Sequence, residues 1–171
     1  MNFEYQRLIP TEFHSDSRIW IYQASRLFTI SEALQIEKLL EDFVNHWKSH
    51  GVPVKGYANL LFGQFVVIMA DETTTGVSGC STDSSVHLIR QIEQQFGVNM
   101  FDRQTLAFIV GDKVQLLPMA QLNYAATNGF INADTFYFNN LAATKEQLLH
   151  SWIVPITQSW LSKRIVFNQI A

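Results

Sequence analysis

Residues 65–96 read FVVIMADETTTGVSGCSTDSSVHLIRQIEQQF, and this stretch indicates a strand, a loop and a helix in succession. The run from Phe65 to Ala70 is apolar and rich in residues that favour strands, and it ends at the acidic pair Asp71-Glu72. A loop rich in hydroxyl side chains and glycine follows. Residues 82–96 then predict a helix, because apolar side chains recur there at helical spacing, namely Val86, Ile89, Ile92 and Phe96.

The sequence before this stretch predicts another strand and the clearest helix of the chain. Residues 18–23 combine β-branched and aromatic side chains, as strands do. Thr29 and Glu32 have the spacing of a capping box, so we expect a helix to begin there and to end before Gly51. Its apolar stripe consists of Ile36, Leu39, Leu40, Phe43, Val44 and Trp47.

Two hairpins complete the predicted core. Strands are expected at residues 54–61, 64–71, 105–110 and 113–117. The turns between them fall at Phe62-Gly63 and Gly111-Asp112. Over residues 18–110 the order is therefore β-α-β-β-α-β. This order predicts an α+β fold with a ferredoxin-like core, in which helices cover one face of an antiparallel sheet.

The length of 171 residues suits a single globular domain over 1–171. We divide it into an irregular N-terminal segment (1–17), the core (18–110) and a C-terminal α/β extension packed on the core (111–171). The extension has a predicted helix at 119–128, a strand at 135–138, and helical stretches at 145–152 and 156–164 that Pro155 interrupts.

The composition excludes several broad classes of protein. A content of 47% hydrophobic and 16% charged residues is typical of a globular chain, and the formal charge of -3 argues against general nucleic-acid binding. The single cysteine fits a reducing compartment. The N-terminus lacks the basic and apolar regions of a signal peptide, and no apolar run approaches about 18 residues. We therefore expect a cytoplasmic protein without membrane insertion.

The loop and the start of the second helix hold most of the candidate site residues. A helix N-terminus has unpaired N–H groups and partial positive charge, so it suits anions and activated thiols. The loop is not a complete phosphate-binding P-loop, because Cys80 occupies the position of its lysine. The candidate ligand-binding residues are Ser78, Gly79, Cys80, Ser81, Asp83, Ser84, Asp102 and Arg103.

Each of these candidates also has a structural interpretation. Cys80 is the candidate catalytic residue, but it could instead be a small buried side chain or an unreactive thiol beside a ligand. His87 lies seven residues further on, roughly 10 Å along the helix, so it cannot easily act as a base for that thiol. Ser81 or Thr82 could cap the helix, and Asp83 in its first turn would then complement the dipole.

The remaining charged residues point to structural roles or to ligand contacts. Asp71 and Glu72 are expected to be solvated loop charges, whereas Asp102-Arg103 could form an ion pair, a cap or a ligand contact. The histidines lack metal-ligand spacing and no loop has the spacing of an EF-hand. We therefore expect no metal and no cofactor.

Three segments carry a resemblance to a known family. They are residues 77–87, Phe101-Asp102-Arg103 and Phe138-Asn139-Asn140-Leu141. With these segments the chain, from Trp20 to Trp160, resembles a family of small uncharacterised bacterial proteins. Some members of that family carry the label "ABC transporter ATPase". The resemblance brings no established activity with it.

Three functions remain open on the sequence alone, and the first is favoured. The chain could be a non-enzymatic binding or adaptor domain, with a protein partner or a second copy as a homodimer, because it is rich in aromatic residues and lacks a complete catalytic set. It could be an enzyme or sensor that uses Cys80. It could also bind a small anion or nucleotide fragment over residues 78–85, with Arg103 as charge partner.

Overall fold

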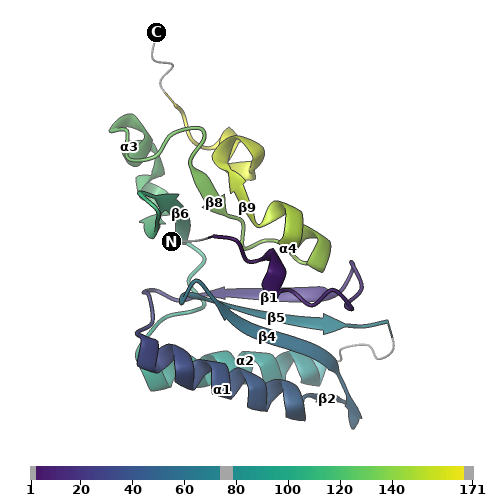
Figure 1. Cartoon of the computed structure of the whole chain (residues 1–171). Coiled ribbons are helices and arrows are strands. Elements are labelled where there is room, and N and C mark those ends of the chain that lie inside the picture. Colours follow the sequence, from purple (N-terminus) through teal and green to yellow (C-terminus); the bar gives the residue numbers. More distant parts are fainter. Residues whose placement is uncertain (1–2, 74–78, 168–171) are drawn as a thin grey trace.

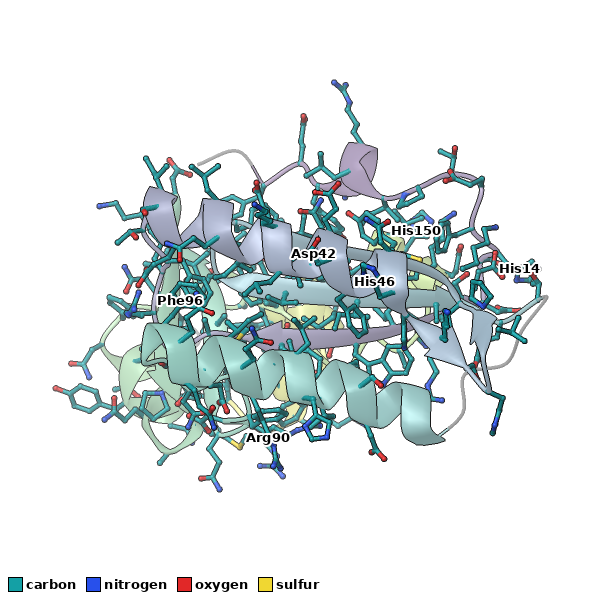
Figure 2. All side chains as sticks on the ribbon, turned by 90° about the horizontal axis from the view of Figure 1, so that it is seen from below. His14, Asp42, His46, Arg90, Phe96 and His150 are labelled. Atoms are coloured by element: carbon teal, nitrogen blue, oxygen red, sulfur yellow. The ribbon has the colours of Figure 1, made fainter. Side chains whose placement is uncertain are left out.

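A three-stranded antiparallel sheet lies at the centre of the computed structural model, which describes residues 3–73 and 79–167. Its order is β1-β5-β4, with β1 (Arg18–Gln23), β4 (Lys55–Leu61) and β5 (Phe65–Asp71). Helices α1 (Ile30–His46) and α2 (Gly79–Phe96) lie side by side across one face of this sheet (Figures 1 and 2). The predicted strands and helices of this part are therefore present, although α2 begins earlier than residue 82.

Local sequence signals explain these elements. The predicted capping box is present, because the Thr29 side chain accepts from the Glu32 N–H and the Glu32 carboxylate accepts from the Thr29 N–H. After α1, a small hairpin of β2 (Lys48–Ser49) and β3 (Val52–Pro53) leads into β4. In the β4–β5 turn, which has three residues between the paired Leu61 and Phe65, Phe62 and Gly63 have φ values of 55° and 62°, both in the left-handed region.

Strand β5 is buried along its whole length because a layer of structure covers each face of the sheet. Toward the helices, Val66 and Ile68 belong to a cluster with Ile36, Leu40 and Ile89. On the opposite face Phe65, Val67 and Met69 pack in a second cluster, whose other members include Tyr5, Ile9, Phe138, Leu148 and Trp152. The uninterrupted apolar run of β5 is the sequence signature of this burial on both faces.

The layer on the face opposite the helices contains a four-stranded sheet of order β7-β6-β8-β9. Its strands are β6 (Thr105–Val110), β7 (Lys113–Pro118), β8 (Phe136–Phe138) and β9 (Ile153–Pro155). The β6–β7 hairpin confirms the predicted turn, in which Gly111 and Asp112 both have positive φ. A third cluster packs on this sheet and includes Phe108, Tyr137, Ile156 and Leu161.

This second sheet corrects the predicted topology. The α+β class is present, and β1-β5-β4 is the strand order that a ferredoxin-like core requires, but the fourth strand, β6, pairs with β7 and β8 instead of β1. The outer edge of β1 is occupied by the segment before α4, since the Ile19 N–H donates to the Ala143 carbonyl at 3.0 Å. The ferredoxin-like arrangement is therefore not confirmed.

The remaining helices are short. They are η1 (Gln6–Leu8), η2 (Met119–Gln121), α3 (Leu122–Thr127), α4 (Lys145–Ser151), η3 (Ile156–Gln158) and η4 (Trp160–Lys163). The helix predicted over 156–164 is thus replaced by two 3-10 helices, and Pro155 ends strand β9. The segment 1–17, expected to be irregular, contains η1 and buries Tyr5, Ile9 and Phe13.

A buried lysine fastens that N-terminal segment to α4. The ammonium of Lys145 donates to the carbonyls of Phe13 at 2.6 Å and Thr11 at 3.2 Å. Tyr5 also donates its hydroxyl to the carbonyl of Leu148. Within the described ranges, no helix combines the length and the apolar character needed to cross a membrane.

Candidate functional site

A cavity of about 110 Å³ opens where the two sheets meet. The end of β1, the loop over residues 97–104, the start of β6, strand β8 and η4 all contribute to it. We call it the Arg103 pocket. Its largely apolar walls are formed by Ile21, Tyr22, Leu106, Tyr137, Leu141 and Trp160.

The loop over residues 97–104 is held firmly by hydrogen bonds. Gly97, with a φ of 62°, ends α2 and donates to the carbonyl of Glu93. The Asn99 side chain accepts from the N–H groups of Phe101 and Asp102 at 3.0 and 3.1 Å. Asn99 and Ser25 exchange two further bonds, which join the loop to the residues that follow β1. The loop therefore presents Asp102 and Arg103 from a fixed backbone.

Asp102 closes a turn within its own loop. Its carboxylate accepts from the hydroxyl of Thr105 at 2.6 Å and from the N–H of Gln104 at 2.7 Å. These bonds hold the pKa of Asp102 below its ordinary value, and the bond from Thr105 has the largest effect. Asp102 thus has a structural role within its turn, and no ion pair joins it to Arg103.

Arg103 is the cation of the pocket. Its side chain is exposed and lines the cavity, and in the part of the chain that the structure describes no carboxylate lies within ion-pair distance of its guanidinium. Burial raises the pKa of Tyr22, while a hydrogen bond with Ser85 and the positive charge of Arg103 act in the opposite direction. Tyr22 and Arg103 line the same cavity, and the positive charge of the guanidinium therefore acts on the phenol.

A chain of amide hydrogen bonds joins the two sheets beside the cavity. Gln23 donates its side-chain N–H to the carbonyl of Thr105 at 3.0 Å. Asn140 donates to the side-chain oxygen of Gln23 at 2.9 Å, and Trp152 donates its indole N–H to the side-chain oxygen of Asn140 at 3.0 Å. Since Gln23 ends β1 and Trp152 precedes β9, this chain fixes the position of one sheet relative to the other.

The residues predicted from sequence fall into two groups along α2. Asp102 and Arg103 follow the end of α2 at Phe96, a residue labelled in Figure 2, and both line the pocket. Gly79, Cys80 and Ser81 form its first turn, and a helix of these 18 residues is about 27 Å long. The side chains of Cys80 and Ser81 lie outside the described residues, as does Ser78 altogether.

Two further predicted candidates are exposed on α2. Asp83 and Ser84 both face solvent, and Ser84 borders a separate groove between the helices together with Asp42 and His87. Ser85 lies in the predicted anion-binding segment 78–85 but was not named among the candidate ligand-binding residues; it is fully buried and bonded to Tyr22 beside the pocket. Helical periodicity offers no signal for this contact, because Tyr22 lies far away in the sequence.

Sequence reasoning also missed the amide network of Gln23 and Asn140. Two segments quoted in the sequence analysis, Phe101-Asp102-Arg103 and Phe138-Asn139-Asn140-Leu141, come together at this site. Residues of both segments line the Arg103 pocket, namely Phe101, Asp102, Arg103, Asn140 and Leu141.

The structure also corrects the expectation that Asp71 is a solvated loop charge. It is buried instead of solvated, with only 2% of the residue exposed. Its carboxylate accepts from the Lys55 ammonium at 2.7 Å, from the hydroxyl and N–H of Thr73, and from the N–H of His14. These interactions, with Lys55 the strongest, hold the pKa of Asp71 well below its ordinary value. Asp71 is therefore a structural anchor for the N-terminal segment.

Within residues 3–73 and 79–167, no group of three histidine, cysteine, aspartate or glutamate side chains is arranged to hold a metal ion.

Comparisons with known proteins add no assignment. No family model, no curated protein and no solved structure matches the chain.

Proposed function

We propose that this chain is a non-enzymatic binding domain whose small-molecule ligand occupies the Arg103 pocket. The proposal rests on one observation: a guanidinium that has no carboxylate partner among the described residues borders a cavity with aromatic walls at the junction of two sheets. Such a combination of apolar walls and a few convergent polar groups is typical of ligand sites.

The volume of the pocket limits the size of the ligand. A cavity of about 150 Å³ binds benzene in another protein, and the Arg103 pocket, at about 110 Å³, is somewhat smaller. A single ring would therefore fill it and extend toward the opening. There Phe101 and Leu141 expose 38% and 63% of their surfaces, so they can cover the outer part of the ligand.

The chemistry of the pocket favours binding over proton transfer. General acid–base catalysis works best when the pKa of the group lies near the working pH. Hydrogen bonds lower the pKa of Asp102, while burial raises the pKa of Tyr22 and Tyr137. All three groups therefore keep one protonation state near neutral pH, as a binding site requires.

A fragment screen by two-dimensional NMR tests the proposal. We expect small aromatic fragments to shift the amide signals of Gln23, Phe101 and Leu106 in the wild-type chain. Leu141→Trp should abolish these shifts, because the larger side chain would cover the opening. Leu34→Trp is the matched control, since Leu34 is also 63% exposed but lies on α1, away from the pocket.

Two results would contradict this function. One is that no fragment shifts the signals of the pocket in the wild-type chain. The other is that fragments bind equally well to the wild type and to Leu141→Trp, since the ligand would then occupy a different surface.

A further inference from the structure

We infer, on the basis of the proposed function, that the ligand of the Arg103 pocket is a small planar monocarboxylate with an apolar body. The carboxylate lies at Arg103, and the body lies between the aromatic walls. The inference follows from three properties of the pocket: its charge, its unused hydrogen-bond donors and its shape.

The charge of the pocket favours a single negative charge on the ligand. Arg103 contributes one positive charge, and Asp102, the neighbouring residue on the same rim, contributes one negative charge. Tyr22 and Tyr137 stay neutral because burial raises the pKa of each. A dianion such as a phosphate monoester would face repulsion from Asp102 with only one cation to offset it, whereas a monoanion needs only the guanidinium.

The hydrogen-bonding groups of the rim also favour an acceptor. The side-chain oxygens of Gln23 and Asn140 already accept from Asn140 and Trp152, and both carboxylate oxygens of Asp102 accept from its own loop. Each amide nitrogen, in contrast, donates one bond among the described residues and has a second N–H beyond it, and a guanidinium has five. The rim therefore offers donors, and a carboxylate only accepts.

The shape of the pocket favours a flat body. The rings of Tyr22 and Phe101 meet edge to face, with centroids 5.6 Å apart, on the side of the loop. The indole of Trp160 donates to the hydroxyl of Tyr137 at 3.3 Å on the side of the second sheet. These two aromatic pairs line a cavity of about 110 Å³, which accommodates a ring better than a branched chain.

Isothermal titration with three compounds tests the inference. Benzoate has the charge and shape described, benzamide is its neutral counterpart, and phenyl phosphate carries the additional charge. We expect benzoate to bind the wild type about ten to a hundred times more tightly than benzamide, the range that a charge-assisted hydrogen bond supports. Phenyl phosphate should bind more weakly than benzoate.

Matched arginine variants locate the carboxylate. Arg103→Gln should lower benzoate affinity by about tenfold or more and leave benzamide affinity unchanged. Arg90→Gln should leave both unchanged, because Arg90 is exposed on α2 and does not line the pocket (Figure 2). Circular dichroism of each variant confirms that it is folded.

The outcomes separate this inference from the proposed function. If benzamide or phenyl phosphate binds as tightly as benzoate, and Leu141→Trp abolishes that binding, the pocket is a ligand site but the monocarboxylate is wrong. Benzoate binding that survives both Arg103→Gln and Leu141→Trp would overturn both proposals. Failure of all three compounds to bind overturns the monocarboxylate, and the fragment screen then decides the function.

Discussion

At the residue scale, the hydrogen bonds around the buried carboxylate of Asp71 hold the N-terminal segment in position. It accepts from Lys55 on β4 and from the backbone of His14, while the same Lys55 donates to the carbonyl of Glu12 at 2.8 Å and lies over the ring of Phe13. A single carboxylate thus joins the end of β5, the start of β4 and the chain before β1.

Asp71→Asn should lower the free energy of unfolding at pH 7 by about 2 kcal/mol, because hydrogen bonds to a charged group are lost. The pKa of Asp71 is lowered in the folded state. Its stabilisation is therefore present above the ordinary aspartate pKa of about 4 and is lost as the pH falls further. Urea unfolding at several pH values should show the wild type and Asp71→Asn converging toward pH 2. Asp42→Asn, an exposed change on α1, is the control, and a gap that stays constant with pH would contradict the account.

At the scale of elements, the contact between β4 and the end of α1 depends on Gly56, which has no side chain. A Cβ atom on Gly56 would lie 2.7 Å from the ring of Trp47, which is only 3% exposed. The ring of Trp47 is itself held by Phe43 and Trp20, at centroid distances of 4.9 and 6.2 Å. The glycine therefore lets α1 pack closely on the edge strand.

Gly56→Ala should destabilise the protein by about 1 to 3 kcal/mol, since overpacking a buried contact forces neighbouring side chains out of position. Thermal unfolding measures the loss, and near-ultraviolet circular dichroism reports the displaced indole. In a Trp47→Leu background the same change should cost much less, because the ring is gone. An equal cost in both backgrounds would show that Trp47 is not the obstacle.

The elements also show what local sequence patterns can and cannot predict. The Thr29–Glu32 capping box and both hairpin turns were predicted correctly because each depends on neighbouring residues. The sheet to which β6 belongs was predicted wrongly, because strand partners are chosen by tertiary contacts. Here residues near Ala143 occupy the edge of β1, and strand periodicity carries no information about such a neighbour.

The candidate site, too, contains residues that the sequence could predict and residues that it could not. Asp102 and Arg103 could be singled out because this adjacent acid and base come just before a predicted strand, where a sheet ends. The rest of the pocket comes from β1, β8 and η4, which are far apart in the sequence, so its members come together only in the folded chain. The burial of Asp71 was missed for a similar reason, since its partner Lys55 lies on another strand.

At the scale of the whole molecule, one aromatic cluster joins the two sheets. The ring of Trp152, which is fully buried, lies within 5.7 Å, between centroids, of Tyr5, Phe62, Phe65 and Phe138. These residues come from the N-terminal segment, the β4–β5 turn, β5 and β8. Because they share one cluster, we expect both sheets to unfold together.

Trp152→Ala should cost about 3 to 5 kcal/mol, as large-to-small changes of buried aromatic residues do. Tryptophan fluorescence and far-ultraviolet circular dichroism should still report one coincident transition at lower denaturant concentration. Trp160→Phe, at a half-buried tryptophan, should cost less. Two separate transitions in the wild type, or an equal cost for both variants, would contradict the shared cluster.

The central claim is that the Arg103 pocket is a ligand site, and a crystal structure of the protein grown with benzoate tests it most directly. The account predicts density for the ring between Tyr22 and Trp160, with the carboxylate on the guanidinium of Arg103. Density for benzoate at another surface, or a pocket filled by the side chains of the protein itself, would contradict it.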